Sequence, residues 1–433
     1  MAKKRVVITG LSAITSYASG IEELWKQLCR AECIVKSVPV CYQTNHAFHS
    51  GYFTPFPDIS GEDYGIAAKY EPLMENNARI ATACAAVALT DAGLKSADGN
   101  VNVSLQKHTT GAGIVIGMGM NSLQTAFSSF VHHVAGHRNY PDFDGCRFNR
   151  MVIPMTMPNS VAAWISMLFG IKGEAYTINA SCASGNYAIG QAFGSISSGR
   201  SSLMICGGVE CLKDDHGAIM RGFDMLGALT CSTDGKPEPF SLNRSGFLFS
   251  EGAGCVLILE ELGHAQKRDA KIYAEIVACG FNSDSHNIVQ MEESGSQIIR
   301  LLKKLVKNVR IDYINAHGTG TVNNDRVEAA IIKKIFGHKG DQPMINSTKS
   351  IIGHTIGASA AIETAVTALS LRNGIVHPTL TSNIIDDVNV VTAPVEADLD
   401  YALNVSYGFG GHNSAVLLKK YSSDVDKKKQ INH

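Results

Sequence analysis

Residues 175–198 read AYTINASCASGNYAIGQAFGSISS, a short run with aromatic and β-branched residues that passes directly into a stretch rich in alanine, glycine and serine. The first part predicts a strand over residues 175–179, and the second part predicts a helix over residues 184–198. The same step from strand to helix recurs along the chain. Strands separated by helices favour parallel pairing with helices on both faces, so the expected fold class is α/β.

The same patterns predict the other regular elements. Further strands are expected over residues 5–9, 113–117, 202–206, 255–259, 272–277, 312–315, 401–405 and 414–418. Further helices are expected over residues 20–29, 77–92, 296–309, 325–336 and 358–371. Residues 39–64 and 132–149 are irregular in pattern, and we expect both spans to be loops that lie over a sheet.

A short repeat hints that the chain contains two similar halves. Ile178-Asn179-Ala180 ends one predicted strand just before Cys182, and Ile314-Asn315-Ala316 ends another just before His317. A repeat of this kind fits an internal duplication whose halves meet near residues 252–262.

The bulk composition excludes several classes of function. Hydrophobic residues make up 45% and charged residues 18% of the 433-residue chain, as in a globular protein with a sizeable core. The 38 basic and 39 acidic residues nearly cancel, which gives no support for binding nucleic acid or a charged membrane surface. No run reaches the roughly 18 apolar residues of a membrane span. The 11 cysteines are scattered without CxxC pairs, which indicates reduced thiols and a cytoplasmic location.

Cys182 is the first candidate for chemistry. It stands between the predicted strand and the predicted helix, on the first turn of that helix. Free N–H groups and the positive end of the helix dipole favour a thiolate at such a place. The small residues around it also allow a substrate to approach the backbone closely. A cysteine that simply packs in the core is the alternative for any single thiol.

Two histidines lie in glycine-rich turns that each follow a strand-like run. His317 stands in AHGTGT, residues 316–321, and His354 stands in GHTIG, residues 353–357. A histidine at such a turn can reach a cleft and exchange a proton near neutral pH. A turn histidine bonded to the backbone is the alternative for each one alone.

A third glycine-rich segment is YGFGGHN, residues 407–413. Its glycines permit tight turns, so a backbone N–H could point into an oxyanion hole. The alternative is a plain turn between two strands. His133 and His137 are spaced by four residues but lack the accompanying glutamate of a zinc helix, so no metal site is expected.

Together these motifs resemble those of β-ketoacyl-acyl-carrier-protein synthases, in the branch of the condensing enzymes with a Cys-His-His site. RVVITGLSAIT at residues 5–15 resembles the opening strand of that family. PFSLNRSGF at residues 239–247, followed by SEGAG at residues 250–254, resembles its middle signature. The resemblance covers residues 4–420.

The resemblance implies a thiolase-like fold, in which two similar α/β halves form a five-layered α-β-α-β-α sandwich. The expected halves are residues 1–253, with the nucleophilic cysteine, and residues 254–421, with the two histidines. Residues 422–433 are expected to be a flexible tail. The resemblance also implies a dimer, either of two copies or of this chain with a chain-length-factor subunit.

The same resemblance implies catalytic roles. Cys182 would carry the acyl chain as a thioester, while His317 and His354 would promote decarboxylation of a malonyl unit and stabilise the enolate. Lys349 would order the site, paired with Glu363. Substrates would arrive on the phosphopantetheine arm of an acyl carrier protein, and no metal or redox cofactor would be needed.

Further residues take supporting roles by the same resemblance. Asp325 and Glu328 would brace the loop of His317. The N–H groups of Cys182 and Phe409 would form the oxyanion hole, with Phe409 also acting as a gate. Met120 stands at a position that resembles the lining of the acyl pocket, although a plain core methionine is an equal alternative.

Departures from the family pattern bear on the pathway. His412 replaces the threonine that is usual after Gly-Phe-Gly-Gly, and Ser12 replaces a common glycine. The run Asn324-Asp325-Arg326 resembles polyketide ketosynthases, and residues 132–149 are atypical. We therefore favour the ketosynthase subunit of a type II polyketide synthase over the fatty-acid elongation enzyme 3-oxoacyl-carrier-protein synthase II.

Three other hypotheses fit the sequence less well. A thiolase would place a second cysteine in the C-terminal glycine loop, where this chain has His412 instead. A non-catalytic chain-length factor would lack the nucleophile, whereas Cys182 and both histidines are present. A Cys-His hydrolase would not need two histidine turns.

Overall fold

The fold rests on ten strands that form one mixed sheet within the residues that the computed structural model describes, which are 3–44, 46–95, 111–121, 123–137, 149–385 and 387–422. The first five strands are β1 (Val6–Leu11), β4 (Gly113–Gly117), β5 (Ala175–Ile178), β6 (Leu203–Cys211) and β7 (Gly252–Glu261). The other five are β8 (Ala274–Ser283), β9 (Tyr313–Asn315), β10 (Met344–Asn346), β13 (Tyr401–Gly408) and β14 (His412–Lys420).

The strand order reveals an internal duplication. The order across the sheet is β10-β9-β13-β14-β8-β1-β7-β6-β4-β5. The sheet divides into a first set, β1 and β4 to β7, and a second set, β8 to β10 with β13 and β14. Read inward from the outer edge of each set, the order is the same: the third strand of the set along the chain, then the second, fourth, fifth and first. The two sets join where β1 pairs antiparallel with β8. The expectation of two similar α/β halves agrees with this topology.

Two details of the expected duplication need correction. The counterpart of β5 by strand order is β10, so the repeated Ile-Asn-Ala after β5 and in β9 does not mark equivalent strands. The expected division at residues 253 and 254 falls inside β7, which pairs with β1 and β6 of the first half. We propose that the division lies after β7, because pairing ties the whole of that strand to the first half.

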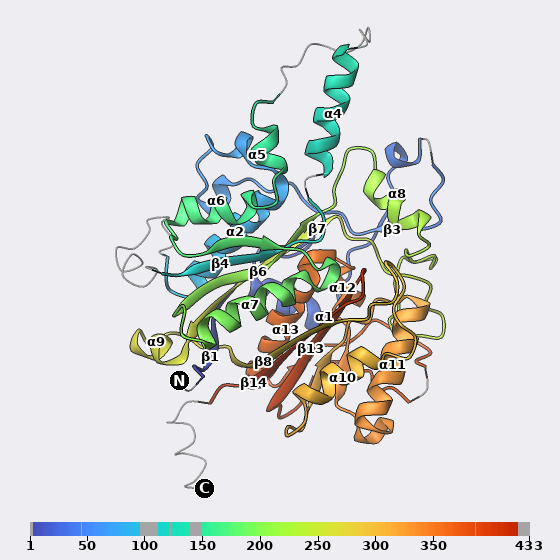
Figure 1. The fold of residues 1–433 in the computed structure, drawn as a ribbon. Coiled ribbons are helices and arrows are strands. Elements are labelled where there is room, and N and C mark those ends of the chain that lie inside the picture. Colours follow the sequence, from blue (N-terminus) through green and yellow to red (C-terminus); the bar gives the residue numbers. More distant parts are fainter. Residues whose placement is uncertain are drawn as a thin grey trace.

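The two sets of strands form two of the five layers, and helices form the other three (Figure 1). Helices α2 (Asn76–Asp91) and α6 (Ser160–Phe169) pack on the outer face of the first set of strands. Helices α10 (Ser296–Leu305) and α11 (Val322–Phe336) cover the outer face of the second set. Between the two sets lie α7 (Ser184–Ser197) and α13 (Ser359–Asn373), which contact each other and strands of both halves. This arrangement is the α-β-α-β-α sandwich expected from the sequence.

Small residues let the two central helices fit between the strands. Residues 359–371 of α13 are all buried, so this helix is surrounded by protein on every side. A Cβ atom built on Gly185 of α7 would lie 2.5 Å from the backbone nitrogen of Ala361 in α13. Glycine at position 185 therefore permits a close helix–helix contact beside the turn that carries Cys182.

The remaining elements surround this framework. The other helices are α1 (Ile21–Arg30), α4 (Leu123–His137), α5 (Val152–Thr156), α8 (Ala218–Met225), α9 (Leu262–Lys267) and α12 (Lys349–Ile352). The short strands are β2 (Lys36–Ser37), β3 (Tyr52–Phe53), β11 (Ile375–Val376) and β12 (Val395–Glu396). Among the described helices, none combines the length and the apolar composition needed to cross a bilayer.

The two predicted loops differ in outcome. Residues 39–64 are mostly irregular, with only β3 and two single 3₁₀ turns. Residues 132–137 were expected to begin a loop, but they belong to α4 instead. The prediction failed there because a helix of mixed polarity lacks a clear apolar stripe. Residues 138–148 and the predicted tail from residue 423 lie outside the described residues.

Candidate active site

Cys182 lies in the 3₁₀ turn Ser181–Ala183, which connects β5 to the start of α7. Ser181 adopts a left-handed conformation with φ of +52°, which is costly for a residue with a side chain. Ser184 holds this turn, because its hydroxyl donates to the carbonyl of Ser181 at 2.6 Å and accepts the N–H of Ala180 at 2.9 Å. The turn thereby directs the Cys182 thiol into the interior of the protein, where the residue is 4% exposed.

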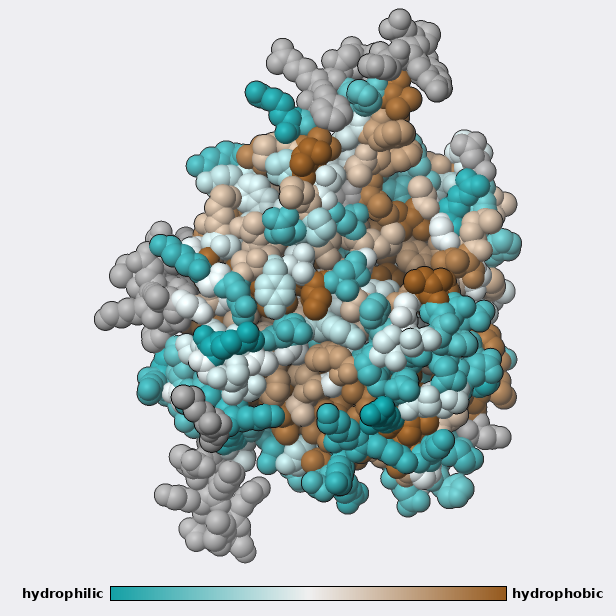
Figure 2. Space-filling model, viewed as in Figure 1, coloured by the Kyte–Doolittle hydropathy of each residue, from teal (hydrophilic) through white to brown (hydrophobic). Residues whose placement is uncertain are grey.

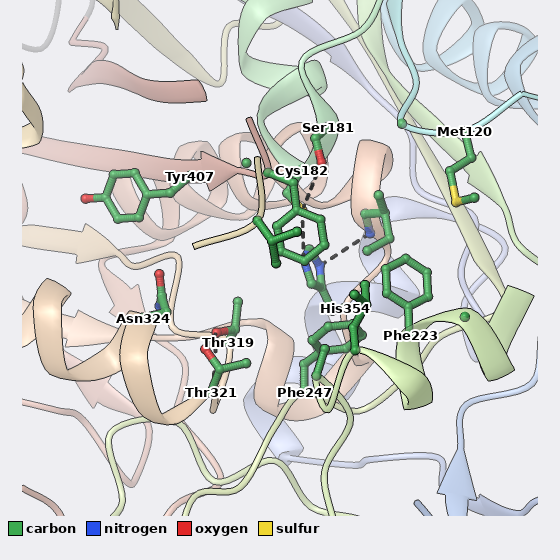
Figure 3. Close-up of a pocket in the computed structure, with 18 of the residues that line it drawn as sticks. Met120, Ser181, Cys182, Phe223, Phe247, Thr319, Thr321, Asn324, His354 and Tyr407 are labelled. Atoms are coloured by element: carbon green, nitrogen blue, oxygen red, sulfur yellow. Dashed lines mark hydrogen bonds between the residues drawn. The ribbon is translucent and has the colours of Figure 1, made fainter. Parts of the chain in front are cut away.

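His354 faces this thiol directly. Its Nε2 atom lies 3.1 Å from the Sγ atom of Cys182, as the dashed line in Figure 3 shows. The N–H of Ile356 donates to His354 Nδ1 at 3.3 Å, and the hydroxyl of Ser359 lies 3.0 Å from the same atom. Because Nδ1 accepts the backbone N–H, the proton of the neutral ring is assigned to Nε2, on the side of Cys182.

His317 completes the cluster at the end of β9. Its ring lies 5.7 Å from that of His354 between centroids, and the two rings are nearly perpendicular. Glu328 holds the backbone at this point by accepting the N–H groups of His317 at 2.9 Å and Gly318 at 2.8 Å. Asp325 accepts the N–H of Gly320 at 3.2 Å and thus fixes the next part of the turn. Both acidic residues thus contact the backbone of the His317 turn, and their role as braces in catalysis stays a prediction.

Lys349 and Glu363 form a buried ion pair beside the cluster. Lys349 Nζ lies 2.5 Å from Glu363 Oε1, and their side chains are 1% and 0% exposed. Burial raises the pKa of Glu363 to about 7, while the charge of Lys349 acts in the opposite direction. The second carboxylate oxygen of Glu363 has no hydrogen-bond partner among the described residues. The ammonium of Lys349 therefore lies close to His317 and His354 in a buried region.

Burial and this charge keep both histidines neutral. Burial lowers the pKa of His317 and of His354 well below the usual 6.5, and the ammonium of Lys349 lowers both further. Burial also raises the pKa of the Cys182 thiol to about 11, although the Ser181 hydroxyl and Lys349 oppose this rise. The expectation that the helix start favours a thiolate is thus outweighed by burial, and the resting group is a thiol.

Phe409 approaches the thiol from the turn between β13 and β14. Its backbone N–H is hydrogen-bonded to the Cys182 thiol. A Cβ atom on the preceding Gly408 would lie 2.6 Å from the carbonyl oxygen of Ala180, so only glycine lets this turn come so close. The turn of Phe409 thus lies against the turn of Cys182, and an oxyanion hole formed by the N–H groups of these two residues stays a prediction.

Cys182, His317, His354 and Phe409 line a single cavity of about 1100 Å³, whereas Lys349, Glu363, Asp325 and Glu328 lie behind its lining. Figure 3 shows Met120 and Phe223 on one side of Cys182 and His354, with Thr319, Asn324 and Tyr407 on the other. Met120 therefore lines the cavity rather than only the core. The cavity opens beside exposed apolar side chains of α4 and of the residue that follows α8, which are Leu123, Phe127 and Leu226. Figure 2 shows apolar surface on this side of the molecule.

Ser359 and Ser406 are site residues that sequence reasoning missed. Ser359 contacts His354 Nδ1, as described above. The Ser406 hydroxyl donates to the carbonyl of Cys182 at 3.0 Å and lies 3.4 Å from His317 Nδ1. The available signal for Ser406 was a polar residue in a mostly apolar strand, a signal that Asn404 in the same strand shares.

With this geometry in place, comparison with known proteins decides the family. Residues 3–264 match the family model of the β-ketoacyl synthase N-terminal domain, and residues 273–383 match that of its C-terminal domain. The chain belongs to the β-ketoacyl synthase family. It is accordingly an acyltransferase of the ketosynthase type, a condensing enzyme. The thiolase and hydrolase hypotheses are set aside by this membership.

Relatives of this β-ketoacyl synthase cover almost the whole chain. A 3-oxoacyl-[acyl-carrier-protein] synthase 2 of Staphylococcus aureus (strain COL) is 32% identical in an alignment that covers 97% of this chain and 99% of the relative. The solved structure of the ishigamide ketosynthase/chain length factor has a TM-score of 0.84 at 26% identity, over 97% of this chain and all of that one.

A second solved structure is a type II polyketide synthase acyl carrier protein in complex with its ketosynthase bound to the hexaketide. It has a TM-score of 0.80 at 25% identity, over 97% of this chain and 100% of that chain. A 3-oxoacyl-[acyl-carrier-protein] synthase 2 and the ketosynthase of a type II polyketide synthase are therefore both similar to this β-ketoacyl synthase along nearly its full length.

Proposed function

We propose that this condensing enzyme is the ketosynthase subunit of a type II polyketide synthase. It would join a malonyl unit, held on an acyl carrier protein, to an acyl chain held on Cys182, with loss of carbon dioxide. The observation that carries the proposal is the approach of His354 Nε2 to within 3.1 Å of Cys182 Sγ inside a cavity that His317 also lines.

The first half-reaction loads the acyl chain. The Cys182 sulfur attacks the carbonyl carbon of the acyl thioester, and the carrier thiol leaves as the new thioester forms. The proton lost by Cys182 passes to the leaving thiol, so no net charge is created. The N–H groups of Cys182 and Phe409 hold the negative oxygen of the tetrahedral intermediate.

The second half-reaction forms the carbon–carbon bond. Nε2–H of His354, with His317, donates to the thioester carbonyl of the malonyl unit, where negative charge develops as carbon dioxide leaves. The enolate carbon then attacks the carbonyl carbon of acyl-Cys182. Collapse of the intermediate expels the Cys182 sulfur, which takes up a proton. Histidines that stay neutral suit this role, because a donor that keeps its proton stabilises the enolate without quenching it.

The polyketide pathway is favoured by the Asn324-Asp325-Arg326 run and by the similar ketosynthase structures. Fatty-acid elongation is the second candidate, because the curated relative is a 3-oxoacyl-[acyl-carrier-protein] synthase 2. A chain-length-factor role without catalysis fits less well, since Cys182 and both histidines are assembled in one cavity.

The proposed partners are an acyl carrier protein, which would deliver both substrates on phosphopantetheine, and a second subunit of the same fold. That subunit would be another copy or a chain-length factor. We also place the enzyme in the cytoplasm, where its cysteines, free throughout the described residues, would stay reduced.

The deciding experiment is mass spectrometry of the products that the purified enzyme makes from malonyl units and candidate carrier proteins, with and without a partner subunit. Unreduced poly-β-ketone chains or chains that need the partner subunit would support the polyketide proposal. Elongation of saturated acyl chains by the enzyme alone would assign it to fatty-acid synthesis. No acyl loading on Cys182 would leave the chain-length-factor role.

A further inference from the structure

Glu210, near the end of β6, is a buried carboxylate that the proposed catalytic steps do not use. Its side chain is fully buried, and it accepts hydrogen bonds from three backbone N–H groups. Oε2 accepts from Gly119 at 2.7 Å and from Gly357 at 2.9 Å, and Oε1 accepts from Met120 at 3.0 Å. The carboxylate thus joins two segments that are more than two hundred residues apart in the sequence.

The first of these segments forms a wall of the cavity beside Cys182. Met120 lines the cavity on the side of Phe223, as Figure 3 shows. The same segment is tied to the turn of the nucleophile, because the side-chain amide of Asn179 donates to the carbonyl of Gly119 at 2.8 Å. A shift of residues 118–120 would therefore move both the wall and a contact of the Cys182 turn.

The second segment positions His354. Gly357 follows Ile356, whose N–H donates to His354 Nδ1 and whose side chain lines the cavity. Because Glu210 fixes Gly357, it also restrains the adjacent Ile356, whose N–H leaves the His354 proton on Nε2. Glu210 lies between the part of the site that holds the acyl chain and the part that handles the malonyl unit.

The two segments lie too close to Glu210 for a side chain at position 119 or 357. A Cβ atom on Gly119 would lie 2.5 Å from Glu210 Oε2, and one on Gly357 would lie 2.7 Å from the same oxygen. A Cβ atom on Gly357 would also lie 2.3 Å from the backbone nitrogen of Gly119. Both segments can meet at the carboxylate only because both positions are glycine.

The chemistry of the contact calls for a carboxylate. All three partners are donors, and an ionised carboxylate only accepts. Burial raises the pKa of Glu210 to about 8, and the three N–H groups oppose this rise. We assign the ionised form from the geometry, because three backbone donors converge on the two side-chain oxygens. A glutamine would keep one carbonyl oxygen but would turn its NH₂ group toward at least one backbone N–H. One buried donor would then lose its partner.

We propose that Glu210 is a positioning residue that couples the acyl-chain wall at Met120 to the His354 turn and thereby sets the length of acyl chain that Cys182 accepts. This inference rests on the proposed role of Cys182 as the acyl carrier. If Glu210 served only stability, its replacement would not change which acyl-chain length Cys182 accepts.

The test compares Glu210→Gln, Glu210→Asp and wild type in the full-length chain. Acylation of Cys182 is followed by intact-protein mass spectrometry with acyl thioesters of increasing length. We expect the ratio of long-chain to short-chain acylation rates to change by about tenfold in Glu210→Gln, the effect of one lost charged hydrogen bond. Glu210→Asp keeps the charge but is one methylene shorter, so we expect a smaller change in the same direction.

Glu260→Gln is the matched control, because Glu260 is also a fully buried carboxylate on the same sheet and binds Thr9 and Arg268 away from the cavity. It should leave the chain-length ratio unchanged even if it lowers stability. An unchanged ratio in the folded Glu210 variants, or an equal change in Glu260→Gln, would overturn the proposal. So would failure of both Glu210 variants to fold while Glu260→Gln folds. If wild type itself is not acylated, the proposed function fails instead.

Discussion

The Nε2 atom of His354 lies 3.1 Å from the Sγ atom of Cys182, although 171 residues separate them in the chain. The proton of His354 is held on this side because its Nδ1 atom accepts the N–H of Ile356. A hydrogen-bond donor fixed beside the nucleophile suits stabilisation of a negative oxygen on a substrate that enters between them.

Replacement of the nucleophile should separate the two half-reactions. Cys182→Ala is expected to abolish acyl loading and condensation, a loss of at least ~10³-fold as for other nucleophile deletions. It should retain malonyl decarboxylation, because His317 and His354 are untouched. Radiolabelled acyl transfer and carbon dioxide release measure the two steps. Cys231→Ala, at an exposed position, is the control. Formation of β-ketoacyl product by Cys182→Ala would refute the mechanism.

Replacement of either histidine should affect the later step more. His317→Ala and His354→Ala are each expected to reduce decarboxylation and condensation by ~10²–10³-fold, the usual cost of one donor to a developing oxyanion. Acyl loading should fall much less, because its oxyanion is held by backbone N–H groups. Radiolabelled acyl transfer and carbon dioxide release measure how far each step is reduced. An equal loss of loading and condensation would count against the assigned roles.

The buried ion pair should behave as one unit. Glu363→Gln leaves the ammonium of Lys349 buried without its carboxylate, and we expect the free energy of unfolding to fall by about 3–5 kcal/mol. The double variant Lys349→Met, Glu363→Gln should be more stable than Glu363→Gln alone, because it removes the unpaired charge. Urea denaturation of wild type, Lys349→Met, Glu363→Gln and the double variant gives the coupling energy. Additive losses would show that the pair is not coupled.

His377 should make the stability depend on pH. Burial lowers its pKa to about 4, and its Nε2 atom lies 3.1 Å from the hydroxyl of Thr348, next to Lys349. The unfolded chain takes up a proton near pH 6.5, but the folded protein does not until about pH 4. Its contribution to stability is therefore complete above pH 6.5 and is lost as the pH falls toward 4.

The measurement is urea denaturation of wild type and His377→Gln at several pH values between 7.5 and 4.5. Wild type should lose up to about 3 kcal/mol more than the variant over this window, the linkage value for a shift of this size. Parallel curves for the two proteins would contradict the assignment.

The wall at Met120 should limit the acyl chain. Met120→Trp adds bulk to the cavity and is expected to shorten the longest acyl chain that Cys182 accepts, while short chains load at near the wild-type rate. Met120→Ala should have the opposite effect. Loading with a series of acyl thioesters checks both variants. If bulk at position 120 slows all chain lengths equally, the residue is not a chain-length wall.

Much of the fold could be predicted because the spacing of apolar residues indicates which segments are strands and which are helices, and these segments form the layers. The strand and helix predicted within residues 175–198 are β5 and α7 in the structure. Residues 132–137 were misassigned, because α4 has apolar residues exposed beside the cavity and so lacks the usual contrast between its faces.

The catalytic candidates were visible in sequence because glycine-rich turns after strands are rare places for a cysteine and two histidines. Glu210 and Ser406 were not assigned to the site from sequence, because a polar residue in a buried strand has many ordinary uses. Their roles depend on which distant backbone groups face them, and no local pattern encodes that.

The sequence by itself determined the α/β class and the Cys182, His317 and His354 turns, since these depend on local periodicity and on motifs, while the duplicated architecture was expected from the family resemblance. Only the tertiary structure decided that His354 rather than His317 faces the thiol, that burial keeps the thiol protonated, and that Glu210 binds two distant segments. The physical reason is that distances, desolvation and hydrogen-bond partners arise only when separate parts of the chain pack together.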